Sequence, residues 1–201
     1  MRLLFARHGE SEANVSGIFS SRGWKHPLTA RGREQAATLA RRLAGENLSA
    51  IYASPLMRAM ETAQIVGETK GLPVNADPAL CEYDVGIHED QTFAIGQPAF
   101  GKIMADWLAG DLDARVEGGE SAVEVIERAS AFLKRLKTDH RDGETLLMVT
   151  HGGILRIAMP RLLTGLTTTM TLAELDHCAI AVAELVNRRF VARSWGEAAI
   201  S

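Results

Sequence analysis

The stretch LLFARHGES, Leu3–Ser11, ends a short apolar run on an arginine, a histidine and a glycine. A second stretch, LLMVTHGG, Leu146–Gly153, also ends an apolar run on His-Gly. Continuous apolar runs of this length are typical of strands buried on both faces in a parallel sheet. Two such strands with the same polar ending therefore predict both the fold and the position of a site.

Strand-like and helix-like segments alternate along most of the chain. Apolar runs predict further strands at 50–54, 179–186 and 189–195, with a tight turn near Asn187 between the last two. Helical spacing and capping residues predict helices after Thr29, Pro55, Ser121 and Gly153, and a short one over 100–108 that follows a loop at 88–98. This alternation predicts an α/β fold of three layers, a mostly parallel sheet with helices on both faces. We expect a single domain over residues 1–201.

Composition limits the classes of protein to which the chain can belong. It has 201 residues, 46% of them hydrophobic, a formal net charge of −3 and two cysteines without a CxxC motif. This balance does not suggest nucleic-acid or membrane partners, and we expect a soluble cytoplasmic protein without disulfides. The run at 179–186 is either an internal strand or an edge at which a homodimer forms.

The two His-Gly endings predict a shared site. Ligands of such sheets bind outside the carboxyl ends of the strands, so His8 and His151 should project toward one crevice. Gly9 and Gly152 would let the backbone approach a ligand closely. Taken singly, each histidine could be an ordinary residue at a strand end.

Two arginines give the predicted crevice a positive charge. Arg7 precedes His8, and Arg58 lies in the first turn after YASP, although a helix arginine can equally be a solvated surface residue. A planar guanidinium can bind two phosphate oxygens at once, so the set suits a phosphate group. A zinc pair is the other interpretation, but no HExxH or cysteine-rich spacing supplies a third ligand. We therefore expect no metal and no cofactor.

The motif LLFARHGESEAN resembles the RHGxSxxN signature of the histidine phosphatase superfamily, the phosphoglycerate mutase-like proteins. Five more blocks resemble the family's motifs in the same order, from Pro27 to Arg156: PLTARGREQA, IYASPLMRAMETA, LCEYDVG, EGGES and MVTHGGILR. The resemblance implies the phosphoglycerate mutase-like fold and a reaction on a small phosphorylated substrate.

The resemblance also implies roles for the histidines and arginines. His8 would attack phosphorus and become a phosphohistidine, since neutral imidazole is a competent nucleophile near pH 7. Its other ring nitrogen should donate to a nearby backbone carbonyl. Arg7, Arg58 and a protonated His151 would hold the phosphoryl oxygens. The two histidines must then lie within about 10 Å of each other, because both reach one phosphoryl group.

The leaving group needs a proton, and a carboxylic acid whose pKa is raised toward neutrality can supply it. Glu82 is the candidate because LCEYDVG resembles the family segment that carries this acid. Asp84 is the local alternative, and Glu82 could also be a plain surface carboxylate.

Four residues are candidates for substrate binding. Asn14, in the RHGxSxxN position, should donate an amide hydrogen to the phosphate, and Gly152 should lie beside it. Ser11 could bind substrate or simply cap a helix. Lys25 stands where many relatives carry aspartate, and with His26 it could add positive charge at the substrate mouth or remain a solvated loop residue.

The sequence supports three functions to different degrees. A phosphomonoester hydrolase acting through His8, with Glu82 as the proton donor, is favoured. A cofactor-dependent phosphoglycerate mutase is less favoured, because few residues separate LCEYDVG from EGGES and can cover the site. A catalytically silent binding module is disfavoured by the complete set of site residues. Many phosphatase-type relatives read GxWEG where this chain has GIHED, with His88 and Asp90, so the substrate stays open.

Overall fold

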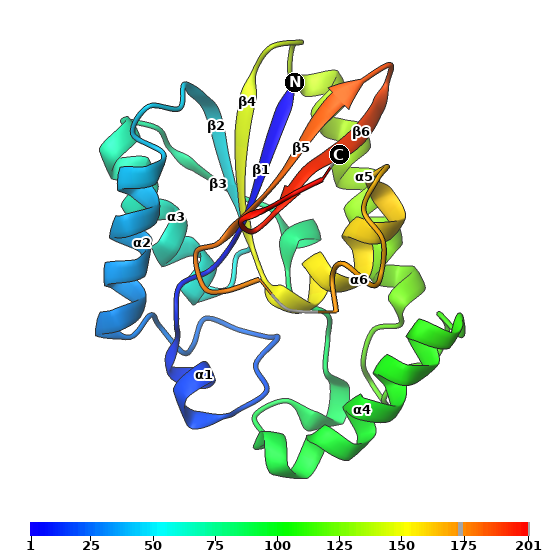
Figure 1. The fold of residues 1–201 in the computed structure, drawn as a ribbon. Coiled ribbons are helices and arrows are strands. Elements are labelled where there is room, and N and C mark those ends of the chain that lie inside the picture. Colours follow the sequence, from blue (N-terminus) through cyan, green and yellow to red (C-terminus); the bar gives the residue numbers. More distant parts are fainter. Residues whose placement is uncertain (173–174, 201) are drawn as a thin grey trace.

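The computed structural model describes residues 1–172 and 175–200. Its centre is a seven-stranded sheet in the order β3-β2-β4-β1-β5-β6-β7 (Figure 1). The strands are β1 Arg2–Arg7, β2 Leu48–Ala53, β3 Val74–Ala76, β4 Thr145–Thr150, β5 Ile180–Val186, β6 Arg189–Trp195 and β7 Ala198–Ala199.

The sheet is mixed, and its parallel part carries the predicted site. Strands β3, β2, β4 and β1 are parallel, whereas β5, β6 and β7 pair antiparallel with their neighbours. The turn between β5 and β6 consists of Asn187 and Arg188, both with positive φ, and so short a turn joins only antiparallel strands. Because β5 pairs with β1 and with β6, 179–186 is an internal strand and not the edge of a dimer.

Helices cover both faces of the sheet, as the alternation predicted (Figure 1). Successive strand residues point to opposite faces. Leu4 of β1 packs with the side of α2 and α3, and Phe5 packs with the side of α5 and α6. The helices are α1 Glu12–Ser16, α2 Ala30–Arg42, α3 Met57–Lys70, α4 Phe93–Ala109, α5 Ala122–Asp139 and α6 Gly152–Leu162, with 3-10 turns η1 Pro78–Leu80 and η2 Gly86–His88. No helix in the described ranges is long and apolar enough to cross a membrane.

Two predicted helix starts are confirmed by their caps, and one predicted start is wrong. The Thr29 hydroxyl accepts from Gly32 N at the start of α2, and the Ser121 hydroxyl accepts from Glu124 N at the start of α5. Helix α4, in contrast, begins at Phe93 and contains Pro98, where a loop was predicted. Tertiary packing overrides the proline, because the first turns of α4 pack against the loop after α1.

Candidate active site

A cavity of about 410 Å³ lies where β1 and β4 end, close to α1 and α4. Arg7 and Thr150 are paired neighbours at the last position of these strands, so the residues that follow them lie side by side. The ring centroids of His8 and His151 are 5.0 Å apart, well inside the limit set above. The lining residues are Arg7, His8, Ala13, Asn14, Ile18, Phe19, Ser20, Arg58, Glu82, Val85, Phe93, Gln97, Gly152 and Gly153.

His8 is buried and held in one orientation. Its Nδ1 lies 2.6 Å from the Gly9 carbonyl oxygen, the backbone contact expected of it, so Nδ1 carries the proton. Nε2 accepts from Nε of Arg58 at 3.1 Å. Burial lowers the pKa of His8 well below its usual value, and the positive charge of Arg58 lowers it further. The result is a neutral imidazole whose lone pair lies on Nε2.

His151 is fully buried, and it differs from the expectation of a protonated donor. Burial, then the charge of Arg58, lowers its pKa well below the usual value, so the ligand-free site holds it neutral. Its Nε2 lies 2.7 Å from the Ser54 hydroxyl, which accepts from Leu56 N and also lies 3.8 Å from Cys81 Sγ. We assign the single Ser54 hydrogen to His151 Nε2, because it is much the nearer and stronger of the two acceptors. Nδ1 then carries the proton, and it has no hydrogen-bond partner among the described residues.

Arg58 is a buried residue of the site and not a solvated helix arginine, since only 5% of it is exposed. Its Nη2 donates to the Ser20 carbonyl and its Nε to His8. Nη1 is buried and finds no acceptor within the described part of the chain. Arg7 lines the same cavity, with Nη1 donating to the Leu175 carbonyl at 2.7 Å.

Glu82 points at the first turn of α6. Its two carboxylate oxygens accept from Gly153 N and Ile154 N, each at 2.8 Å, and Tyr83 N adds a third contact at 3.0 Å. Backbone N–H groups at a helix N-terminus favour the charged carboxylate over the neutral acid in the ligand-free site. Asp84 lies outside the cavity lining and pairs with Arg22 at 2.7 Å.

Two of the four substrate-binding candidates line the cavity, and two lie outside its lining. Asn14 and Gly152 line the cavity. The Asn14 side-chain oxygen accepts from both N and Oγ of Ser11, which leaves its amide hydrogens for a ligand. Ser11 itself is fully buried outside the lining, so it positions Asn14. Lys25, also outside the lining, pairs with Asp90 and with Glu89 at 2.9 Å.

Gly9 approaches protein and not ligand. A Cβ built on Gly9 would lie 2.5 Å from the carbonyl oxygen of Gly32, at the start of α2. The glycine therefore lets the loop after β1 rest on that helix, which corrects the expectation that it makes room for a ligand.

The sequence profile of the histidine phosphatase superfamily (branch 1) matches residues 3–198, nearly the whole chain. The chain belongs to this superfamily. It is 34% identical over 182 residues to the adenosylcobalamin/alpha-ribazole phosphatase of Salmonella typhimurium, covering 88% of this chain and 84% of the relative. It is 32% identical over 152 residues to phosphoserine phosphatase 1 of Hydrogenobacter thermophilus, covering 75% of this chain and 71% of the relative. Other relatives are named as phosphoglycerate mutases.

A solved structure agrees with the family assignment. The mycobacterial glucosyl-3-phosphoglycerate phosphatase in complex with VO3 matches with a TM-score of 0.84 and 28% identity, over 97% of this chain and 98% of that one. The seven-stranded α/β fold of this chain is therefore the fold of the superfamily. Within residues 1–172 and 175–200, no group of three or more metal-ligating side chains could hold a metal ion.

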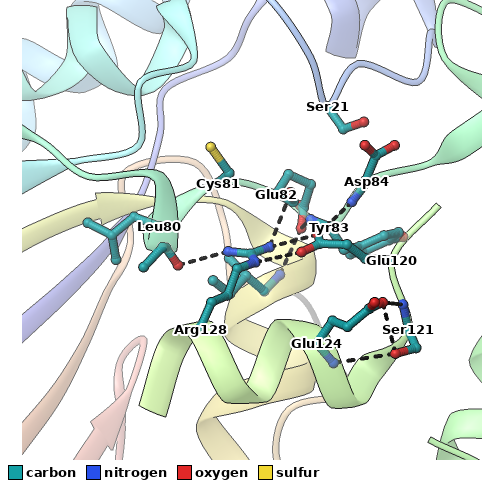
Figure 2. A network of polar contacts seen from close by, with 12 residues as sticks. Ser21, Leu80, Cys81, Glu82, Tyr83, Asp84, Glu120, Ser121, Glu124 and Arg128 are labelled. Carbon is teal, nitrogen blue, oxygen red and sulfur yellow. Dashed lines mark hydrogen bonds and ion pairs between the residues drawn. The ribbon is translucent and has the colours of Figure 1, made fainter. Parts of the chain in front are cut away.

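In this superfamily member, a network that sequence reasoning missed holds the segment bearing Glu82 (Figure 2). Arg128 of α5 donates to the carbonyls of Ala79 and Glu82 and pairs with Glu120 at 2.9 Å. Glu120 in turn accepts from Asp84 N. The only signal in the sequence was the position of Glu120 within EGGES, before the long helix.

A third histidine, also missed, contacts the backbone that carries His8. His177 Nδ1 lies 3.0 Å from the His8 carbonyl oxygen, and the two ring centroids are 5.6 Å apart. No motif marked His177, because it lies far from His8 in sequence and is brought close by the pairing of β5 with β1. Its charge, when present, lowers the pKa of His8.

Acid should destabilise this fold through the two buried histidines. In the folded protein His8 and His151 stay neutral, whereas in the unfolded chain both take up protons below about pH 6.5. The free energy of unfolding therefore falls as the pH falls through that value. Between pH 7.5 and 5.5 each histidine costs up to about 1.4 kcal/mol of unfolding free energy. Urea unfolding at both pH values measures the loss, and the double variant His8→Asn/His151→Asn should lose much less. An equal loss in both proteins would contradict the prediction.

Replacing Gly153 by alanine should displace Glu82. A Cβ at this position would lie 2.3 Å from a ring carbon of Tyr83 and 2.5 Å from Glu82 Oε1. We expect Gly153→Ala to lower kcat about 10- to 100-fold and to cost about 1–3 kcal/mol of stability. Gly101→Ala is the matched control, because nothing lies within 4 Å of the added Cβ. A Gly153→Ala protein with wild-type kcat would show that Glu82 does not need this position.

Proposed function

We propose that this protein is a phosphomonoester hydrolase that acts through a phosphohistidine on His8. The observation that carries the proposal is the neutral His8 imidazole, whose Nε2 contacts Arg58 and whose ring centroid lies 5.0 Å from that of His151. Arg58 Nη1 and His151 Nδ1 are buried and lack partners among the described residues, so both can serve a ligand. Relatives named as phosphatases of several substrates support it.

In the first step His8 Nε2 attacks phosphorus and the bond from phosphorus to the ester oxygen breaks. The Nε of Arg58, which contacts His8 Nε2 in the ligand-free site, shifts to a phosphoryl oxygen as substrate binds. Arg7, Arg58, Asn14 and His151 Nδ1–H donate to the equatorial oxygens and offset the developing charge.

The leaving oxygen takes a proton from Glu82. The contacts of Glu82 favour its charged form while the site is empty, but a bound phosphate places a second negative charge nearby and favours proton uptake by the carboxylate. In the second step the Glu82 carboxylate accepts a proton from water as that water attacks phosphorus. The bond between nitrogen and phosphorus breaks, which releases phosphate and restores neutral His8.

Trapping with an alkaline denaturing quench tests the proposed intermediate. Wild-type protein mixed with an aryl phosphate in EDTA should release phosphate and should carry a phosphoryl group that is stable in alkali and labile in acid, as a phosphohistidine is. Phosphate release without any such adduct would overturn the His8 mechanism. Binding of inorganic phosphate without turnover of any ester would indicate a silent binding module instead.

A mutase is the second candidate, because some relatives carry that name. The acceptor of the phosphoryl group during turnover by the native phosphoenzyme distinguishes the two activities. A hydrolase passes the phosphoryl group to water even when 3-phosphoglycerate is present, whereas a mutase passes it to 3-phosphoglycerate.

A further inference from the structure

The cavity is much larger than a phosphate group, and most of the lining side chains not assigned to the phosphate are apolar. A volume of about 410 Å³ is of the size that accommodates a small organic ligand. His8, Arg58 and Glu82 are among the lining residues that the proposed reaction uses. The apolar lining residues are Ala13, Ile18, Phe19, Val85 and Phe93, and the polar side chains not assigned to the phosphate are Ser20 and Gln97. The space beside this wall of side chains must hold the alcohol portion of a phosphomonoester.

Two aromatic rings of this wall are fixed in place by the backbone. Phe19 N donates to Gln91 O, and Phe93 N donates to Gly17 O at 2.7 Å, so the loop after α1 is tied to the start of α4. The rings of Phe19 and Phe93 meet edge to face, with centroids 4.7 Å apart. A Cβ on Gly96 would lie 2.5 Å from the Phe19 ring, so this glycine admits the ring against α4. Phe19 and Phe93 therefore form a preorganised surface in the ligand-free protein.

The basic side chains around this wall either border the phosphate-binding residues or form ion pairs with acidic side chains. The cations among the described lining residues are Arg7 and Arg58, which border His8 together with the carboxylate of Glu82. The basic residues of the loop after α1 pair elsewhere, Arg22 with Asp84 and Lys25 with Glu89 and Asp90. A carboxylate on the alcohol would lose its hydration against Phe19 and Phe93 and gain no ion pair there, which is costly.

We propose that the substrate is the phosphomonoester of an uncharged alcohol that bears a ring or a similarly apolar face, which packs on Phe19 and Phe93. Ser20 and Gln97 supply the polar contacts within this wall. Phosphomonoesters whose alcohol carries a carboxylate, such as 3-phosphoglycerate and phosphoserine, are poor substrates. This inference rests on the proposed phosphatase activity and names its substrate class.

Steady-state kinetics on 1-naphthyl phosphate, 3-phosphoglycerate and phosphoserine test the proposal. Wild type should prefer the naphthyl ester in kcat/KM by at least about 100-fold. Phe93→Ala should lower kcat/KM for that ester about 10-fold. The same variant should leave kcat/KM for ethyl phosphate nearly unchanged, because an ethyl group is too small to reach the ring. Phe93→Arg should raise kcat/KM for 3-phosphoglycerate and so reduce the preference for the naphthyl ester. Leu108→Ala, an exposed apolar position near the other end of α4, is the matched control.

Equilibrium binding separates this proposal from the proposed reaction. In His8→Ala, which should not turn over, calorimetry should show 1-naphthyl phosphate binding tighter than inorganic phosphate and 3-phosphoglycerate binding no tighter than inorganic phosphate. That result supports the substrate class even if wild type forms no phosphohistidine. Equal or better binding or turnover of the carboxylate-bearing esters would overturn it.

Discussion

His8→Ala should lower the rate of phosphate release by at least about 10⁴-fold, because loss of a nucleophile removes the covalent step itself. His8 is the only lining residue of the described chain that combines a neutral nucleophilic nitrogen with contacts that orient it, through Gly9 O and Arg58 Nε. The measurement is initial phosphate release from 1-naphthyl phosphate. The trapped phosphoryl adduct should disappear in the same variant.

Two controls make the His8 result interpretable. His26→Asn changes another histidine outside the cavity lining, at a residue with φ of 57°, a conformation that asparagine tolerates. It should keep the wild-type rate. Inorganic phosphate should still raise the melting temperature of His8→Ala, since Arg58 and His151 remain. A His8→Ala protein that keeps even one-tenth of the wild-type rate would exclude the phosphohistidine mechanism.

The meeting of His8 and His151 could be predicted from sequence because it depends on one rule. Two buried parallel strands with polar endings bring those endings to a common edge, whatever the rest of the chain does. Caps at Thr29 and Ser121 could be predicted for the same reason, since a hydroxyl before a helical pattern acts locally. Local signals of this kind need no knowledge of distant contacts.

The parts of the site that depend on distant partners could not be predicted. Predicting the contacts of Glu82 with α6 would require the position of the first turn of α6 relative to Glu82 in the folded chain. Arg128 likewise lies 46 residues along the chain from the Glu82 carbonyl to which it donates. The early start of α4 depends on packing of Gly96 against Phe19. The neutral state of His151 follows from full burial beside Arg58, which no spacing of residues indicates.

The buried Arg58 joins binding to the chemistry of His8, so its replacement should have two separable effects. Arg58→Met should lower kcat/KM about 10²- to 10³-fold, because a bound phosphate loses its most buried cation. The same variant removes a positive charge that lowers the pKa of His8. With that charge gone the pKa rises, His8 is protonated at higher pH, and the acid limb of the kcat/KM profile moves to higher pH.

Arg58→Lys separates the charge of Arg58 from its geometry. Lysine keeps a positive charge near His8, so the acid limb should stay close to its wild-type position. It cannot reproduce the planar fork that reaches His8 and Ser20 and leaves Nη1 for a ligand, so kcat/KM should still fall substantially. Arg41→Lys, on the exposed side of α2, is the control. If Arg58→Met left both the rate and the pH profile unchanged, Arg58 would neither hold the phosphoryl group nor set the protonation of His8, and the proposed mechanism would lose its main cation.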